Sequence, residues 1–177
     1  MASSHLHTLT GRLVTLRPAD ETELSQLAEA LAADANASPW LGTDPSVILT
    51  WFRGDGVSAF VVDSQGTALG VITFEEELDP DYHAANIDIG LLSGATGRGV
   101  GPDALATLVE YLFTVRGHHR VTIDPAVANT RAIRAYERVG FKPVGVMREY
   151  ERGSDDQWHD NLLMDLLKRE LMPTSGS

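Results

Sequence analysis

Residues 95–102 read Ala-Thr-Gly-Arg-Gly-Val-Gly-Pro, and they stand between an apolar, strand-like run and an amphipathic helical pattern. Glycine at every second position lets the backbone approach a ligand closely, because no Cβ intervenes. Residues 103–113 then repeat leucine and valine at helical spacing. A glycine turn that ends at a helix N-terminus presents free N–H groups and the positive end of the helix dipole. The stretch therefore predicts an anion site and a ligand that carries phosphate.

A second strand–helix pattern follows the glycine turn and is needed to interpret it, since such turns also occur for purely steric reasons. Residues 119–124 have the pattern of a strand, and residues 130–140 that of an amphipathic helix. Gly140 stands where a helix C-cap is expected, and Phe141 restarts an extended run. Strand, glycine turn, helix, strand and helix thus follow one another in this half of the chain.

Two motifs in this order carry a family resemblance. TGRGVG at 96–101, followed by DPAVANTRAIRAYERVGF at 124–141, resembles the GNAT superfamily of acetyl-CoA-dependent N-acetyltransferases. The second motif looks most like the aminoglycoside 6'-N-acetyltransferases. Residues 145–149 and 157–160 give a secondary resemblance to the branch that acetylates the N-termini of ribosomal proteins. The resemblance extends over residues 87–167.

The resemblance implies acetyl-CoA as co-substrate, with its phosphates on the glycine turn. The turn departs from the family at Thr96, where glutamine or arginine is usual, and Arg98 is expected to reach a phosphate instead. Tyr136 matches the tyrosine that protonates the leaving thiolate, although a tyrosine at this spacing also suits core packing. Asn129 matches a cofactor-binding asparagine and also suits a helix N-cap. The implied cofactor-binding residues are Leu91, Thr96, Gly97, Arg98, Gly99, Val100, Gly101, Asn129 and Tyr136.

Carboxylates are expected where the acceptor amine reacts. An amine with a pKa of ~10.4 is almost wholly protonated at pH 7, and removing the proton costs roughly 4 kcal/mol. Asp88 interrupts an apolar strand and, by the resemblance, stands where aminoglycoside acetyltransferases meet the amine; a solvated strand position is the alternative. Asp124 is either a second acceptor-binding residue or the start of an Asp-Pro turn. Glu75 and Trp40 complete the expected acceptor site, although Trp40 equally suits core packing.

The composition limits the function classes. The chain has 177 residues, of which 43% are hydrophobic and 22% charged, and this fits one GNAT-like domain over residues 1–177 with flexible ends at 1–10 and 172–177. Because cysteine is absent, a disulfide framework and an acyl-cysteine intermediate are excluded, and direct transfer is expected. With no signal peptide or membrane-length apolar run, a cytoplasmic protein without a membrane partner is expected. His118 and His119 lack a third ligand at zinc spacing, so no metal site is expected.

The charge and the motifs together leave several functions open. A formal net charge of −11 argues against nucleic-acid binding and favours cationic partners, although it also serves solubility. The leading hypothesis is direct acetyl transfer to an amine of a cationic small molecule, such as an aminoglycoside 6'-amine, which would give antibiotic resistance. A protein N-terminal acetyltransferase and a non-catalytic acyl-CoA-binding module are alternatives, and a dinucleotide-binding Rossmann domain is weaker. We expect a monomer or a homodimer.

The whole chain predicts the order β-α-α-β-β-β-α-β-α-β-β. This order is typical of an α/β fold in which a mixed central sheet carries helices on both faces, and the resemblance assigns it to the GNAT fold. The expected strands are 12–17, 58–63, 67–75, 85–92, 119–124, 141–150 and 158–167, and the expected helices are 20–33, 45–52, 103–113 and 130–140, with a loop at 35–45.

Overall fold

One mixed sheet of eight strands runs through the structure, a computed structural model that describes residues 6–171. The strand order is β1-β2-β3-β4-β5-β6-β8-β7. Only β5 and β6 run parallel to each other; all other neighbours in the described sheet are antiparallel. The strands are β1 (Leu9–Thr10), β2 (Thr15–Pro18), β3 (Ser58–Ser64), β4 (Thr67–Glu77), β5 (Ala84–Leu91), β6 (Arg120–Ile123), β7 (Lys142–Arg152) and β8 (Trp158–Leu167).

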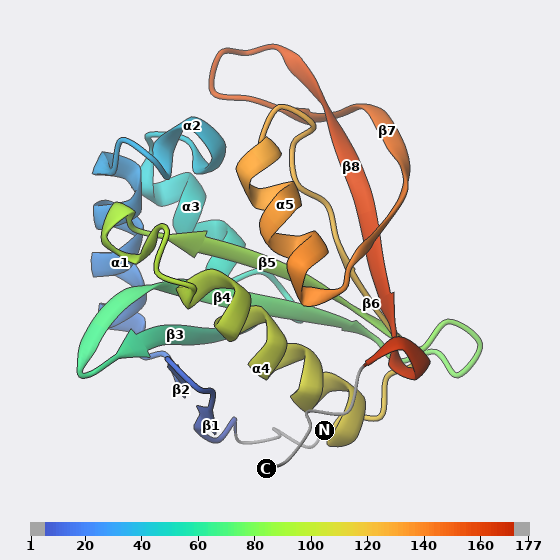
Figure 1. Ribbon diagram of the computed structural model, residues 1–177. Helices are drawn as coiled ribbons and strands as arrows, with labels where there is room; N and C mark the ends of the chain where they lie inside the picture. Colours follow the sequence, from blue (N-terminus) through green and yellow to red (C-terminus); the bar gives the residue numbers. More distant parts are fainter. Residues whose placement is uncertain (1–5, 172–177) are drawn as a thin grey trace.

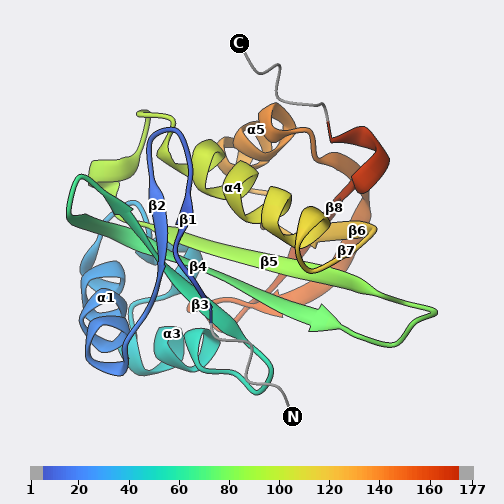
Figure 2. The ribbon, with the colours of Figure 1, turned by 90° about the horizontal axis from the view of Figure 1, so that it is seen from below.

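Helices cover both faces of the sheet, which confirms the predicted α/β architecture (Figure 1). Figure 2 shows α1 and α3 on one side of the sheet and α4 and α5 on the other. None of the helices within residues 6–171 is long and apolar enough to cross a bilayer. The helices are α1 (Glu21–Ala33), α2 (Ser38–Leu41), α3 (Pro45–Phe52), α4 (Val100–Thr114) and α5 (Thr130–Val139), with short 3₁₀ turns η1 (Ser93–Ala95) and η2 (Lys168–Glu170).

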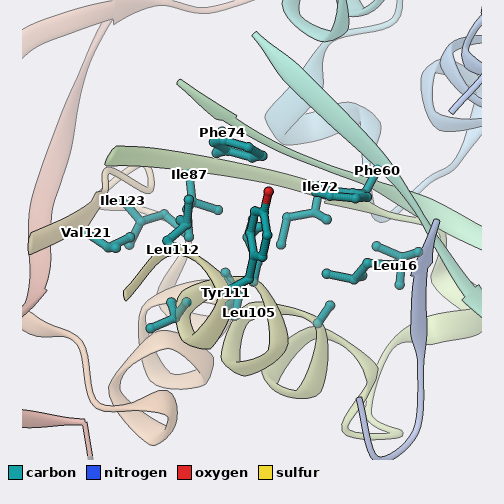
Figure 3. Packing of buried hydrophobic residues seen from close by; sticks show 14 of the residues in the cluster. Leu16, Phe60, Ile72, Phe74, Ile87, Leu105, Tyr111, Leu112, Val121 and Ile123 are labelled. Carbon is teal, nitrogen blue, oxygen red and sulfur yellow. The ribbon is translucent and has the colours of Figure 1, made fainter. Parts of the chain in front are cut away.

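The larger of two hydrophobic clusters lies between α4 and the sheet. Leu105 and Leu112 of α4 are fully buried in it, at the helical spacing seen in the sequence. Tyr111 of α4 meets Phe60 and Phe74 edge-on, with ring centroids 6.4 and 6.3 Å apart (Figure 3). These contacts fix α4 against the sheet, and the N-terminus of α4 consequently lies beside the end of β5.

The parallel strands β5 and β6 pair over a short stretch and then separate. Its register includes only Ala85 with Val121 and Asn86 with Thr122. Beyond Asn86 the two strands share no further paired residues, so the carboxyl-terminal half of β5 has no partner on its β6 side. Ligands of open α/β sheets bind in such crevices at the carboxyl ends of strands. The fold therefore places its crevice directly before the glycine turn.

The segment expected to be a loop over residues 35–45 contains a short helix, α2, and this expectation was wrong. Pro39 lies in its first turn, where a missing N–H costs nothing. The Asp34 carboxylate accepts two backbone N–H groups just ahead of the helix, at 2.9 and 3.0 Å. Trp40 consequently lies on a helix rather than on a loop.

Strand β2 begins at Thr15, whereas a strand over residues 12–17 was expected. The residues before Thr15 are instead hydrogen-bonded to the first turn of α4. The Asp103 carboxylate accepts the backbone N–H groups of residues 12–14 at 3.2, 2.7 and 3.0 Å. Helix α4 itself begins at Val100 rather than at residue 103. Its first turn is therefore tied to the N-terminal segment.

The N-terminal stretch 1–10, which we expected to be flexible, contains an ordered part. Leu9–Thr10 pairs with β2 as strand β1, and Leu6 packs against the core. Residues 1–5 and 172–177 lie outside the described residues, so the expectation of flexible ends is not tested there.

Candidate active site

A cavity of about 300 Å³ lies between the end of β5 and helix α5. The glycine turn forms one wall, α5 a second, and the segment with α2 a third. Its lining residues are Asn36, Ala37, Trp40, Leu41, Ile89, Gly90, Leu91, Ala95, Thr96, Gly97, Gly99, Gly101, Pro102, Leu105, Asn129, Arg131, Ala132, Ala135, Tyr136 and Arg138. The cavity thus brings together most of the residues expected to bind the cofactor.

The glycine turn has the geometry of an anion cradle. Gly97 and Gly99 have φ values of 74° and 78°, in the left-handed region that favours glycine. A Cβ on Gly97 would meet open space, whereas one on Gly101 would lie 3.2 Å from the Leu91 side chain. The first intrahelical bond of α4 runs from the Asp103 N–H to the Gly99 carbonyl at 3.1 Å. The N–H groups that precede it have no intrahelical acceptor, and a phosphate fits such a site.

The arginines that line the cavity are Arg131 and Arg138, and not Arg98, which was expected to reach a phosphate. Arg98 does not line the cavity; its guanidinium donates to the Gly94 carbonyl at 3.2 Å. Val100 is buried, with 3% of its surface exposed. Arg131 and Arg138 of α5 line the cavity instead. Sequence reasoning missed both arginines, although their spacing of two helical turns places them on one face of α5.

Tyr136 and Asn129 enter the cavity from α5. Burial raises the pKa of the Tyr136 phenol well above its ordinary value, and the charges of Asp88 and Asp124 raise it further. The phenol is therefore protonated at neutral pH. Asn129 caps α5 by accepting the Ala132 N–H at 3.2 Å. The N-cap position and the cavity-lining position, which sequence reasoning treated as alternatives, coincide in this residue.

Asp88 stands on the half of β5 that pairs with β4 but has no partner on its β6 side, and it alternates with Ile87 and Ile89, which face α4. Solvent reaches the side chain, yet enough protein surrounds the carboxyl group that burial raises its pKa to about 7, with the charges of Asp124, Glu151 and Glu75 contributing. Since Asp88 and Asp124 both act on the Tyr136 phenol, these three groups lie close together. Asp88 can therefore exchange a proton near neutral pH.

Asp124 follows β6 and faces the same region. Burial raises the pKa of its carboxyl group, and the Glu151 charge raises it further, while hydrogen bonds from Asn161 and Tyr150 lower it. Glu75 is exposed on β4, and Trp40 lines the cavity from α2. Asp124 and Glu75 thus lie near Asp88, whose pKa their charges raise, and these carboxylates are not among the residues that line the cavity, whereas Trp40 is.

Three residues close to Asp124 were not predicted from the sequence, namely Tyr150, Glu151 and Asn161. They come from β7 and β8, whose residues sequence reasoning placed in a plain hairpin. The only available signal was the run of charged and aromatic residues at 148–152, where strand alternation is lost. A charge run is more often a solvated face, so this signal was weak.

His118 and His119, which were considered as metal ligands in the sequence, lie outside the cavity, and so does His159. His118 is fully buried and its Nε2 lies 2.7 Å from the Glu76 carboxylate. His119 places Nδ1 2.7 Å from the His83 carbonyl. His159 pairs with Asp155 at 2.9 Å on the exposed β7–β8 hairpin. None of the three histidines therefore contacts a residue that lines the cavity through these interactions.

Comparisons with known proteins identify the family of the chain. The family model described as acetyltransferase (GNAT) domain matches residues 13–142. An aminoglycoside N(6')-acetyltransferase type 1 of Klebsiella pneumoniae is 28% identical over 160 residues, which cover 76% of each chain. A kanamycin resistance protein of Rhizobium radiobacter is 37% identical over 75 residues, covering 42% of this chain and 68% of that protein. The structure of Mycobacterium smegmatis RimJ in complex with CoA-disulfide superposes with a TM-score of 0.79 at 26% identity, covering 96% of this chain and 88% of that one.

Proposed function

Because this chain belongs to the GNAT family of acetyltransferases, we propose that it acetylates a primary amine of a polycationic small molecule, an aminoglycoside 6'-amine foremost. The family assignment makes it an acetyl-CoA-dependent N-acetyltransferase. The acceptor is inferred from the site. The observation that carries the proposal is the grouping of Asp88, Asp124 and the protonated phenol of Tyr136 beside the cavity of the glycine turn.

The residues around the cavity fit acetyl-CoA. Backbone N–H groups of the glycine turn would hold the pyrophosphate, and Arg131 and Arg138 offer charged partners to further phosphate oxygens. Asn129 would bind the pantetheine or phosphate part, in the role that the family resemblance assigns to it. When bound, the co-substrate supplies an activated acetyl group as a thioester.

Asp88 would act as the general base. Its pKa of about 7 allows it to accept a proton from the acceptor ammonium when the carboxylate is ionised. The neutral amine nitrogen then bonds to the acetyl carbon, and the carbon–sulfur bond breaks. The nitrogen loses its second proton in this step, and that proton restores the phenol of Tyr136 after Tyr136 has protonated the thiolate. Direct transfer fits a chain without cysteine. Asp88 finally releases its proton to solvent.

Tyr136 would act as the general acid toward the departing thiolate. The phenol is protonated at neutral pH, because its pKa is raised by burial and by the two neighbouring carboxylates. An ammonium group bound at Asp88 and Asp124 offsets these negative charges and lowers the pKa of the phenol. Acceptor binding thereby prepares Tyr136 to donate its proton.

The charge of the chain supports a cationic acceptor. The formal net charge is −11, and Asp124, Glu151 and Glu75 all act on Asp88. Two relatives are named for aminoglycoside acetylation and kanamycin resistance, which favours an amino sugar. A basic peptide with a free α-amine also suits the charge, so the acceptor class needs a direct test.

The test is a panel of acceptors assayed by thiol release from acetyl-CoA. It compares multi-amine aminoglycosides, a linear polyamine and basic peptides with free N-termini. We expect the highest kcat/KM with aminoglycosides. Turnover with the peptides alone would contradict the proposed acceptor, and absence of turnover with all of them would contradict catalysis of amine acetylation.

A further inference from the structure

Strand β7 departs from regular pairing next to Asp124. The register pairs Met147 with Asn161 and Glu151 with His159, so residues 148–150 lie opposite Asp160 alone. Glu149 within this bulge has a φ of +49°, which is unfavourable for a residue other than glycine. Its N–H donates to the Asp160 carboxylate at 2.8 Å. Bulges next to active sites re-aim side chains, and the residue after Glu149, Tyr150, lies close enough to Asp124 for that charge to raise the pKa of its phenol.

Asn161 joins the bulge to the chain after β6. Its side-chain amide is buried, with 3% of the residue exposed. Nδ2 donates to the Asp124 carbonyl at 2.9 Å and to Glu151 Oε2 at 3.1 Å. Both partners are acceptors, so the amide nitrogen, and not the oxygen, faces them. Glu151 is therefore held at a fixed place relative to Asp124.

The carboxylates around Asp88 have no cationic partner in the part of the chain that the structure describes. The charges of Asp124, Glu151 and Glu75 raise the pKa of Asp88, and the charge of Glu151 raises the pKa of Asp124. Within residues 6–171 every ion pair involves other carboxylates. A group of close, partly buried carboxylates without a cation is unfavourable. A bound polycation would supply the missing positive charges.

We propose that Glu151 is a specificity-determining residue that binds a second ammonium group of the acceptor, and that Asn161 is the positioning residue that holds it. This inference rests on the proposed function. Asp88 receives the reacting amine, while Glu151, held beside Asp124 by Asn161, selects acceptors that carry another amine. An acceptor with a single amine leaves Glu151 without a partner.

The first test compares Glu151→Gln with Glu149→Gln, which changes an exposed carboxylate of the same bulge. Acceptors are a multi-amine aminoglycoside and an amino sugar with one primary amine. Because a charge-assisted hydrogen bond contributes about 1.5–3 kcal/mol, Glu151→Gln should lower kcat/KM for the multi-amine acceptor by roughly 10- to 100-fold. The value for the monoamine should change less than about twofold, and Glu149→Gln should resemble the wild type for both. Equal losses for both acceptors, or no loss, would overturn the proposal.

A pH profile separates this role from general structural damage. The charged groups that act on Asp88 are Asp124, Glu151 and Glu75. Removing the Glu151 charge should therefore shift the acid limb of the kcat/KM profile to lower pH, while Glu149→Gln leaves it in place. An unshifted limb would show that Glu151 does not act on the reacting site.

A double-mutant cycle tests Asn161. If it acts through Glu151, Asn161→Ala should reduce multi-amine selectivity, and adding it to Glu151→Gln should cause little further loss. Independent, additive losses would contradict the positioning role. Should Asn161→Ala fail to fold, Glu151→Gln still decides whether Glu151 selects the acceptor. Wild-type protein without aminoglycoside turnover would contradict the proposed function itself, whereas wild-type turnover with an unchanged Glu151→Gln contradicts only this inference.

Discussion

At the scale of single residues, one environment gives Asp88 and Tyr136 opposite tasks. Burial and neighbouring carboxylates raise the pKa of both groups. For Asp88 the result is a pKa of about 7, where a carboxylate can take up and release protons under working conditions. For Tyr136 the result is a phenol that is protonated at neutral pH, and a bound ammonium group would lower its pKa. The same environment thus makes the carboxyl group of Asp88 a base and the phenol of Tyr136 an acid, because the two groups have different ordinary pKa values.

This assignment predicts the pH dependence of the reaction. Only ionised Asp88 can accept a proton, so kcat/KM should rise with pH through about 7, the apparent pKa belonging to the coupled carboxylates. Asp88→Asn should lower kcat on the order of 100-fold and remove this limb. Steady-state kinetics between pH 5.5 and 8.5 check it (roughly the range that brackets the Asp88 titration). A variant with wild-type kcat would make Asp88 a solvated strand residue.

At the scale of elements, the glycine turn and the start of α4 form the cofactor site. Gly101 lies in the first turn of α4, and its Cβ position lies 3.2 Å from a Leu91 side-chain atom at the cavity wall. Gly94, in the preceding 3₁₀ turn, has open space around its Cβ position and no left-handed φ. The two glycines therefore give a matched pair of substitutions.

Gly101→Val should abolish stabilisation by CoA, whereas Gly94→Val should keep it. At a ligand concentration 100-fold above Kd, CoA should stabilise the wild type by about 2.7 kcal/mol, which raises Tm by roughly 5–10 °C. Thermal unfolding with and without CoA measures the shift. A Gly101→Val protein that folds and retains the full shift would exclude this turn as the cofactor site.

The elements also show what local sequence can and cannot predict. The glycine turn, α4 and α5 follow from local signals, namely left-handed glycines, Asn129 as N-cap and Gly140 as C-cap. The bulge of β7 does not, because Glu149 adopts its conformation through a contact with Asp160 on another strand. Glu151 and Asn161 were missed for the same reason, since only the tertiary fold brings them to Asp124.

At the scale of the whole molecule, stability and activity depend on different titrating groups. His118 is fully buried; its Nε2 pairs with Glu76, and its Nδ1 has no hydrogen-bond partner. Arg116 pairs with the same carboxylate at 2.6 Å. None of these residues lines the cavity. Burial lowers the pKa of His118 despite the opposing effect of Glu76.

The lowered pKa of His118 predicts that its contribution to stability is lost in mild acid. Below about pH 6.5 the unfolded chain binds a proton at this histidine that the folded chain resists, so unfolding becomes more favourable as pH falls. The depressed pKa of Glu76 acts only at lower pH, below about 4.5. Urea unfolding of wild type and His118→Gln at pH 7.5 and 5.5 isolates the effect (roughly one pH unit either side of the histidine reference). The stability difference between the two proteins should shrink at the lower pH, and a constant difference would contradict the prediction.

Acetyl transfer to the 6'-amine of an aminoglycoside can be decided with one matched pair of acceptors. Two aminoglycosides that differ only in an amine or a hydroxyl at position 6' are incubated with acetyl-CoA and wild-type protein. We predict thiol release and a monoacetylated product with the first compound, with the acetyl group located on the 6' nitrogen by mass spectrometry. With the second compound we predict only background release. Equal turnover of both compounds, or acetylation at another nitrogen, would contradict this prediction.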